Sequence, residues 1–393
     1  MTIPDHVPVH LVYDFDFFEA PVGKIHPQAE VSRELHANAP AIFYTPRNGG
    51  HWAITRYKEA DEISKAFQVF SNHPDYDVTK PKFPRHVPSD YDPPEHTDFR
   101  RSYNRFFTPR LMDRVRDEIQ KMAIKLIEGV KPDGRCEFIT QIAEFYSVSI
   151  FLEMVKAPPQ DRQKLIDLAH GYGKHPDANV RMASKTAMAE YLRSLVDDRE
   201  KNPGDDLVTE MINARVADRE MTPGEKLGML SVTFFGGLES VASMTSLMVQ
   251  FLGRHPELKR QLIEDETLLE SSGLEELLRV NSINCTTRGV SGDFEFNGIQ
   301  FRQNDRVFTL RPVIGFDDRQ TDAPYDYDLK REEITHAAFG TGPHRCPGSH
   351  LARMELAIFL AEWLKRIPEY RVVDVAMRGG VAWGPSRLDL EWV

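Results

Sequence analysis

Cysteine is scarce in this sequence, with only three among 393 residues. Cys136, Cys285 and Cys346 are widely spaced and odd in number, so they do not suggest a disulfide framework, and their spacing matches no zinc-binding pattern. The first residues, from Met1 to His6, lack the basic and apolar regions of a signal peptide. We therefore expect a protein of a reducing compartment, the cytoplasm.

Long apolar runs and excess positive charge are missing as well. A membrane span needs about 18 or more consecutive apolar residues, whereas the longest apolar tract, around residues 227–252, is broken by glycines, a glutamate and serines. The 60 acidic residues outnumber the 49 basic ones and give a net charge of −11. We therefore expect no membrane and no nucleic acid as partners. Neither a phosphate-binding glycine loop nor a dinucleotide-binding fingerprint is present, so electrons for any redox chemistry must come from elsewhere.

Helical periodicity dominates the chain after residue 95, and strand-like alternation is found toward both ends. Helices are predicted over residues 96–107, 109–129, 136–156, 158–172, 178–199, 205–214, 223–253, 255–263, 273–280 and 349–366. Strands are predicted near residues 41–45, 51–55, 284–290, 293–301 and 306–311, and in the last 25 residues. Residues 75–95, rich in proline, aspartate and histidine, are expected to form a long functional loop. Because no linker or repeat divides the chain, we expect one domain over residues 1–393, with a mainly α fold and small peripheral β-sheets.

Residues 339–348, with the sequence FGTGPHRCPG, form the most informative segment, which we call the cysteine loop. Cys346 lies in a turn bracketed by glycines, and an amphipathic helix is predicted directly after it. Backbone N–H groups of such a turn, together with the positive end of the helix dipole, favour a thiolate, which is a metal ligand. Gly340 and Gly342 would let the chain lie flat beneath a wide cofactor. A planar metallocofactor, haem, meets these demands.

The predicted helix over residues 223–253 is the second informative segment. It begins with a capping box that starts at Thr222 and places proline at the first helical position. Residues 236–240, with the sequence GGLES, combine a glycine pair, which weakens a helix and permits a kink, with an acid and a hydroxyl. Taken alone, this run is explained as well by close helix packing at the glycines with the polar residues on a wet face.

Together, the two segments resemble the cysteine-ligand loop and the oxygen-binding helix of the cytochrome P-450 family, the haem-thiolate monooxygenases. The resemblance covers essentially the whole chain and is closest to the camphor-hydroxylase branch of soluble bacterial enzymes. It implies the cytochrome P-450 fold, with haem b (iron protoporphyrin IX) as the cofactor and Cys346 as the axial ligand of the iron. A thiolate ligand donates electron density to iron and favours O–O cleavage.

The same resemblance assigns roles to further residues. Phe339 would pack beside the sulfur, and four residues would contact the ring or its propionates: His96, Arg100, Arg288 and His344. Glu239 and Ser240 would deliver protons to bound oxygen, and Gly236 would leave room for oxygen and substrate. Serine stands here where threonine is commoner, and it lacks the β-branch that stiffens threonine. Pro347, which has no N–H, removes one possible donor to the sulfur. Glu276, Arg279 and Arg331 would hold the cysteine loop.

The resemblance also indicates a substrate class and an electron donor. The camphor enzyme binds its substrate ketone with a loop tyrosine, but the matching loop here, residues 80–88, has no tyrosine at that place. The residues expected to line the substrate cavity are Phe83, His86, Val232, Phe235, Ile283 and Asn284. Such an apolar cavity with few polar anchors suits a terpenoid or a norisoprenoid such as an ionone. The branch takes electrons from a small acidic [2Fe–2S] ferredoxin with its NADH-dependent reductase, and Arg100, Arg101 and Arg345 could form a basic patch that attracts it.

The expected activity is oxygen-dependent hydroxylation of a small hydrophobic substrate. A peroxide-driven haem-thiolate enzyme is the first alternative, although it would not need the acid and hydroxyl at Glu239 and Ser240. A non-enzymatic haem-binding sensor is the second alternative, although a sensor usually needs an output domain, for which we find no residues left over.

Overall fold

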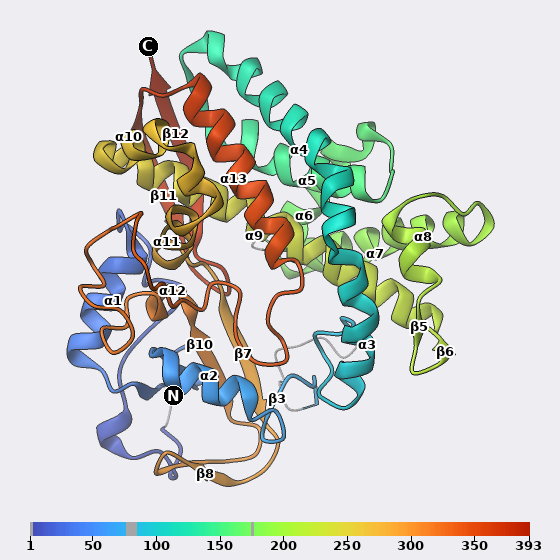
Figure 1. The fold of residues 1–393 in the computed structure, drawn as a ribbon. Coiled ribbons are helices and arrows are strands. Elements are labelled where there is room, and N and C mark those ends of the chain that lie inside the picture. The colour runs from blue at the N-terminus through green and yellow to red at the C-terminus, as the bar shows by residue number, and fades with distance from the viewer. Residues whose placement is uncertain (1–2, 76–84, 174–176) are drawn as a thin grey trace.

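The longest helix of the fold, α9 (Pro223–Arg254), runs through its centre (Figure 1). The computed structural model describes residues 3–75, 85–173 and 177–393. In these ranges α9 packs against α5 (Glu144–Met154), α7 (Ala178–Lys201) and α13 (Ser349–Arg366). The helix begins at the predicted capping box, because the Thr222 hydroxyl accepts from the N–H of Glu225 and the Glu225 carboxylate accepts from the N–H of Thr222.

The glycine pair of α9 does not interrupt the helix. The helix is continuous through Gly236 and Gly237. A Cβ atom at either position would meet nothing within 4 Å, which also excludes close helix packing as the reason for the glycines. Among the described residues, α9 is the one helix long and apolar enough to cross a membrane, but 67% of that apolar window is buried inside the fold. It is therefore a core helix.

The remaining helices after residue 95 agree with the prediction except at two places. They are α3 (Glu95–Tyr103), α4 (Pro109–Val130), α6 (Arg162–Gly173), α8 (Leu207–Ile212), α10 (Pro256–Glu264) and α11 (Ser272–Val280). The short α12 (Arg311–Ile314) was not predicted, and its first residue was assigned to the preceding strand. The other exception is residues 136–143, which were predicted to begin a helix. Cys136 instead lies in strand β4 (Arg135–Glu137), and a π-helical turn (Ile139–Ala143) leads into α5. β4 pairs with a strand near the C-terminus, and no local pattern reveals such a distant partner.

Two helices near the N-terminus, α1 (Pro27–Asn38) and α2 (Tyr57–Lys65), were not predicted. In α2 only Ala60 and Ile63 are buried, which is too few apolar residues to give a helical period. In α1 the buried face includes Gln28 and Ser32, so it is partly polar. Both helices are therefore specified by their packing in the folded protein more than by their own pattern.

A five-stranded sheet has the order β1-β2-β10-β7-β3, in which β2 and β10 are parallel and the other neighbours are antiparallel. Its strands are β1 (Ile42–Thr45), β2 (His51–Ile54), β10 (Arg306–Leu310), β7 (Cys285–Val290) and β3 (Phe70–Ser71). The segment 293–301 is a hairpin of β8 (Phe294–Phe296) and β9 (Ile299–Phe301), because Asn297 and Gly298 turn the chain with φ angles of 51° and 75°. A small hairpin joins β5 (Arg215–Val216) to β6 (Arg219–Glu220).

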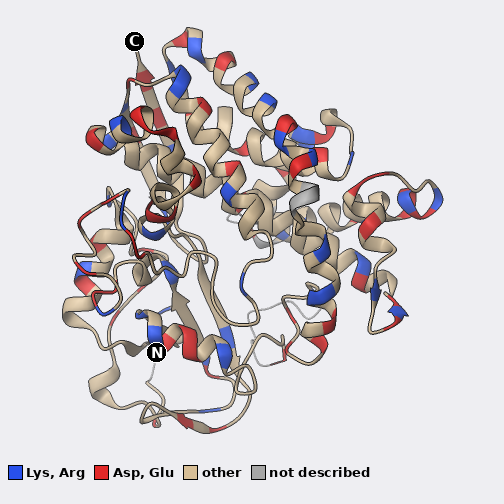
Figure 2. Ribbon diagram, in the orientation of Figure 1, with Lys and Arg blue, Asp and Glu red and all other residues tan. Residues whose placement is uncertain are grey.

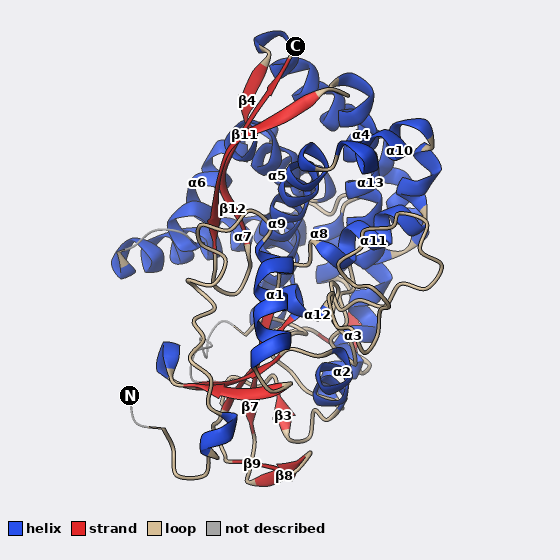
Figure 3. Ribbon diagram, turned by 90° about the vertical axis from the view of Figure 1, so that its left-hand side faces the viewer, coloured by secondary structure: helices blue, strands red, loops and turns tan. Residues whose placement is uncertain are grey.

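The last 25 residues form the predicted strands, β11 (Tyr370–Arg378) and β12 (Gly384–Trp392), and β12 also pairs with β4. Figure 3 shows the five-stranded sheet and the β8–β9 hairpin at one end of the molecule, with these C-terminal strands toward the other. The largest apolar cluster surrounds α5, α9 and α13, and two smaller clusters pack against the five-stranded sheet. The predicted mainly α fold with small peripheral sheets is therefore confirmed.

Candidate functional site

A cavity of about 600 Å³ lies between α9, the cysteine loop and β7. Thirteen of the predicted site residues line this cavity: His96, Arg100, Val232, Phe235, Gly236, Glu239, Ser240, Ile283, Asn284, Arg288, Phe339, His344 and Cys346. His86 instead lines a smaller side cavity of about 170 Å³ next to it. Phe83 lies outside the described residues. The fold thus brings predicted site residues that are up to 250 positions apart in the sequence, from His96 to Cys346, to the same cavity.

The cysteine loop is shaped by backbone hydrogen bonds and two glycines. The N–H of Cys346 donates to the carbonyl of Phe339 at 2.8 Å. Gly340 and Gly342 have φ angles of 71° and 68°, a conformation that side chains disfavour. A Cβ at Gly340 would lie 2.6 Å from the Arg311 guanidinium, and one at Gly342 would lie 2.7 Å from the Ser64 carbonyl oxygen. The glycines therefore serve the turn and its protein contacts.

Burial decides the protonation of the ligand cysteine. Burial raises the pKa of the Cys346 thiol, and the opposing contributions of the Gly348 N–H and the guanidinium of Arg311 do not offset it. The N–H of the turn thus acts toward a thiolate, as predicted, but burial outweighs it. A cation bound at the sulfur would supply the missing stabilisation, because metal coordination deprotonates a thiol outright. Cys346 thus fits a site whose anionic form depends on a metal.

The imidazole of His96 is a buried polar group that faces this cavity. The residue is 2% exposed, and its Nε2 has no hydrogen-bond partner in the described part of the chain. Its ring lies 4.1 Å from that of His344, centroid to centroid. Burial, together with the nearby Arg100, lowers the pKa of His96 to about 4, so the ring is neutral near pH 7. Buried polar groups are normally satisfied, so this N–H group fits an acceptor on a ligand.

Three guanidinium groups also line the cavity. Arg100 donates to Asn104 Oδ1 at 2.7 Å and to the Arg345 carbonyl, and Arg288 donates to the Thr287 carbonyl at 2.7 Å. Arg311, which sequence reasoning missed, makes no hydrogen bond or ion pair with the residues described. Burial lowers the pKa of Arg311 to about 10, which leaves it cationic at neutral pH. Three cations and two imidazoles fit a ligand with two carboxylates, as haem b has in its propionates.

A partly buried cysteine that lines an apolar cavity ringed by cationic groups defines a haem-thiolate protein. The chain belongs to the cytochrome P450 family, because the family model described as "Cytochrome P450" matches residues 135–368. The protein is therefore a cytochrome P450 monooxygenase that binds haem b through a cysteine thiolate. The family predicted from the cysteine loop and the central helix is confirmed.

Curated relatives and solved structures agree with this assignment. The chain is 31% identical to the probable cytochrome P450 127A1 of Sinorhizobium fredii, over 99% of this chain and 97% of that protein. It is 27% identical to a steroid C26-monooxygenase of Rhodococcus jostii, over 96% of this chain and 82% of that protein. Among solved structures, CYP101J2 superposes with a TM-score of 0.89 at 32% identity, and CYP101C1 with a TM-score of 0.90 at 30% identity; both comparisons cover 100% of each chain.

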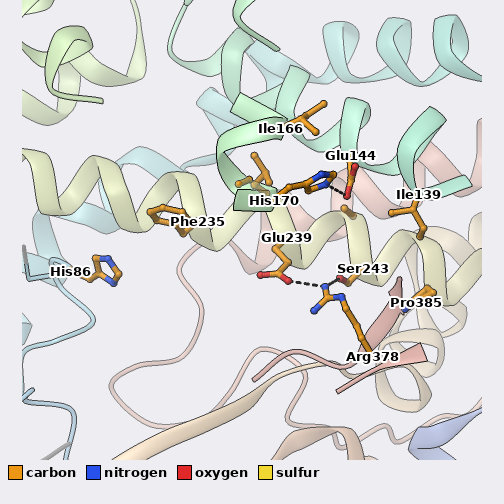
Figure 4. Close-up of a pocket in the computed structure, with 13 residues that line it drawn as sticks. His86, Ile139, Glu144, Ile166, His170, Phe235, Glu239, Ser243, Arg378 and Pro385 are labelled. Atoms are coloured by element: carbon orange, nitrogen blue, oxygen red, sulfur yellow. Dashed lines mark hydrogen bonds and ion pairs between the residues drawn. The ribbon is translucent and has the colours of Figure 1, made fainter. Parts of the chain in front are cut away.

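Glu239 of α9 stands between the main cavity and the side cavity and lines both. Its carboxylate lies 2.7 Å from the guanidinium of Arg378, which comes from the end of β11 (Figure 4). Across the side cavity, His170 and the Glu144 carboxylate are 2.6 Å apart. Ser240 follows Glu239 and lines the main cavity. The Glu239 carboxylate thus borders both cavities, and the Ser240 hydroxyl next to it borders the main cavity.

The predicted pairing of Glu276 with Arg279 and Arg331 is present in the structure. Both oxygens of Glu276 accept from Arg279 at 2.7 Å, and Arg331 Nε lies 3.4 Å from the same carboxylate. Arg279 and Glu276 are 0% and 1% exposed, so the pair is not the surface salt bridge that its spacing alone would suggest.

Sequence reasoning missed three residues of the site: Arg311, Arg378 and Glu355. Glu355 lies on α13, lines the main cavity and is 4% exposed. Burial raises the pKa of its carboxyl to about 8. Arg311 follows strand β10, Arg378 ends strand β11, and neither belongs to a motif. Glu355 is one of two acids on α13, so nothing in the local pattern distinguishes these residues.

Proposed function

We propose that this cytochrome P450 monooxygenase hydroxylates a small hydrophobic terpenoid or norisoprenoid. The apolar lining of the cavity carries this proposal. Val232 and Phe235 come from α9, Ile283 lies just before β7, and Asn284 beside it offers a polar anchor. A mostly apolar cavity with a few polar anchors suits a molecule of mostly carbon with about one oxygen function.

A steroid is the second candidate, because several relatives are steroid C26-monooxygenases at 26–29% identity. The space of about 600 Å³ must hold the porphyrin as well as the substrate. The room left above the ring is therefore a fraction of the whole. This supports the compact substrate over the larger one.

The roles of the residues follow from their places around the cavity. Haem, when bound, supplies the activation of O2 by iron, with Cys346 as the ligand. His96, Arg100, Arg288 and His344 hold the propionates, and Phe339 packs beside the sulfur. Ser240 holds a proton at its hydroxyl inside the cavity, and Glu239 connects that hydroxyl with the side cavity. Gly236 leaves open space on the same face of α9.

A [2Fe–2S] ferredoxin, reduced by an NADH-dependent reductase, is the electron donor that we propose, in the cytoplasm. Figure 2 shows charges of both signs over the helices. The last turn of α3 carries Arg100 and Arg101, and Arg100 bonds the carbonyl of Arg345 in the cysteine loop. These cations would steer an acidic partner to the cysteine side of the site. Raising the salt concentration should therefore slow reduction, and a rate indifferent to salt would exclude steering.

A spectral screen tests the substrate class. The haem-loaded protein is titrated with camphor, β-ionone, a sesquiterpene and cholest-4-en-3-one, and the Soret shift that reports loss of water from the iron is followed. We expect the norisoprenoid and terpenoid arms to give the shift, and hydroxylated product to form with O2 and a ferredoxin. A shift with the steroid alone would overturn the proposed substrate class. Cys346→Ser, which should lose the carbon-monoxide band diagnostic of thiolate ligation, checks the ligand.

A further inference from the structure

Arg378 joins the acid of the central helix to a second segment of the chain. Its Nη2 lies 2.7 Å from Glu239 Oε1 and donates to the Ser243 hydroxyl at 3.2 Å (Figure 4). Its Nη1 donates to the carbonyl of Ala382 at 3.2 Å. The side chain is 23% exposed, so these contacts are partly shielded from water. One planar guanidinium thus bonds α9 on one side and the chain between β11 and β12 on the other.

The chain between β11 and β12 is also a wall of the main cavity. Val381 and Ala382 line the cavity beside Ile283 and Asn284. The two segments are hydrogen-bonded, because the N–H of Cys285 donates to the Val381 carbonyl at 2.8 Å and the N–H of Trp383 donates to the Ile283 carbonyl at 2.8 Å. We call residues 381–383 the wall segment. A molecule that packs against the wall segment therefore contacts residues that are hydrogen-bonded to Arg378 through the Ala382 carbonyl.

Glu239 can deliver protons to the main cavity only if its carboxylate stays at the boundary between the two cavities. The side chain is 43% exposed and lines both cavities. A long carboxylate on a helix has several rotamers, and an ion pair with a fixed partner selects one of them. Arg378 is that partner, and its own position depends on the wall segment.

We propose that Arg378 is a positioning residue that couples the wall segment to the carboxylate of Glu239. The inference rests on the proposed role of Glu239 in proton delivery and deepens it. Substrate that fills the cavity fixes the wall segment, the wall segment fixes Arg378 through the Ala382 carbonyl, and Arg378 holds Glu239 at the boundary. Arginine is required because its planar fork reaches two directions at once, whereas a lysine ammonium is a single point of contact.

Hydrogen exchange in the resting, haem-loaded protein tests the coupling without turnover. Arg378→Lys should speed exchange of the Cys285 and Trp383 amides about tenfold, the ratio given by about 1.4 kcal/mol of lost interaction. Glu239→Gln should speed the same amides, although it lies on another element. The control is Arg371→Lys on β11, where Arg371 is 74% exposed and pairs with Glu391, and it should leave these amides unchanged. Unchanged exchange in Glu239→Gln would overturn the proposal. If Arg378→Lys does not retain haem, the result for Glu239→Gln alone is the test.

Turnover with β-ionone, a [2Fe–2S] ferredoxin and its NADH-dependent reductase gives the second readout. Arg378→Lys should raise peroxide released per NADH about twofold, a change of about 0.4 kcal/mol in how oxygen partitions. The double variant with Glu239→Gln should match Glu239→Gln alone, because Arg378 acts through the acid. If Glu239→Gln itself equals the wild type, the proposed role of Glu239 fails. If Glu239→Gln leaks peroxide and Arg378→Lys does not, only the coupling is wrong.

Discussion

Glu276 and Arg279 form a bidentate ion pair in which both N···O distances are 2.7 Å and both side chains are buried. Arg279 also donates to the carbonyls of Gly315 and Pro324, on the chain that leads from α12 toward the cysteine loop. The pair therefore fixes α11 to the segment that precedes the iron ligand. Its contribution is structural, because neither side chain lines the cavity.

Removing one partner of this pair should be costly. In Glu276→Ala the Arg279 guanidinium stays buried without its counter-ion, so we expect a loss of about 3–5 kcal/mol in the free energy of unfolding. Chemical denaturation of the haem-loaded protein measures the loss. The control is Glu391→Ala, which breaks an exposed pair with Arg371 and should cost about 0–1 kcal/mol. Similar losses in the two variants would contradict a buried structural role.

The hydroxyl of Ser240 should deliver protons less exactly than a threonine hydroxyl would. The Ser240 hydroxyl lines the cavity, and no hydrogen bond to the described residues holds its χ1 angle. Threonine is stiffer at χ1, and Ser240→Thr should therefore give more product per NADH and less peroxide. Ser240→Ala, which has no hydroxyl, should give the least product. Equal coupling of electron use to product in the serine and threonine proteins would exclude this idea.

Pro347 should increase the electron donation of Cys346 to iron. The N–H of Gly348 already donates to the Cys346 sulfur, and Pro347, which has no N–H, offers no second donor. Pro347→Leu restores an N–H, which withdraws charge from the thiolate. We expect the iron reduction potential to rise by roughly 30–60 mV, about 0.7–1.4 kcal/mol for one electron. Pro347→Ala should give the same rise, which separates the N–H from side-chain size; an unchanged potential in both contradicts the argument.

Local patterns were sufficient for the parts of the site that lie on one segment. The cysteine loop, the capping box at Thr222 and the i, i+3 pair of Glu276 and Arg279 are each short in sequence and were found from it. The helix predicted over residues 349–366 has those bounds in the structure. Arg378 could not be predicted in the same way, because its partner Glu239 is far away in sequence and meets it only in the folded chain.

Burial is the second property that a single sequence conceals. The spacing of glycines correctly marked the cysteine loop, yet the net effect on Cys346 depends on how deeply the thiol is buried. Gly340 and Gly342 also pack against Arg311 and Ser64, and no pattern in the sequence indicated these contacts. Burial and packing both depend on neighbours in space, which periodicity and spacing do not supply.

Glu355 should make the stability of the protein depend on pH. Burial raises the pKa of its carboxyl to about 8, compared with 4.5 for the exposed group. Between these values the folded state holds a proton that the unfolded state releases, so the free energy of unfolding falls as pH rises from about 4.5 to 8. The full difference corresponds to roughly 5 kcal/mol. Glu355→Gln, which cannot ionise, should flatten this fall.

Denaturation of the haem-loaded protein at several values between pH 5 and 8.5 measures the slope. The matched control is Glu190→Gln, because Glu190 is an exposed glutamate of α7 and its removal should leave the wild-type slope in place. The two variants carry the same chemical change, so their difference isolates burial in the cavity. If Glu355→Gln keeps the wild-type slope, the carboxyl is hydrated in the haem-loaded protein, and water must reach α13 from the cavity.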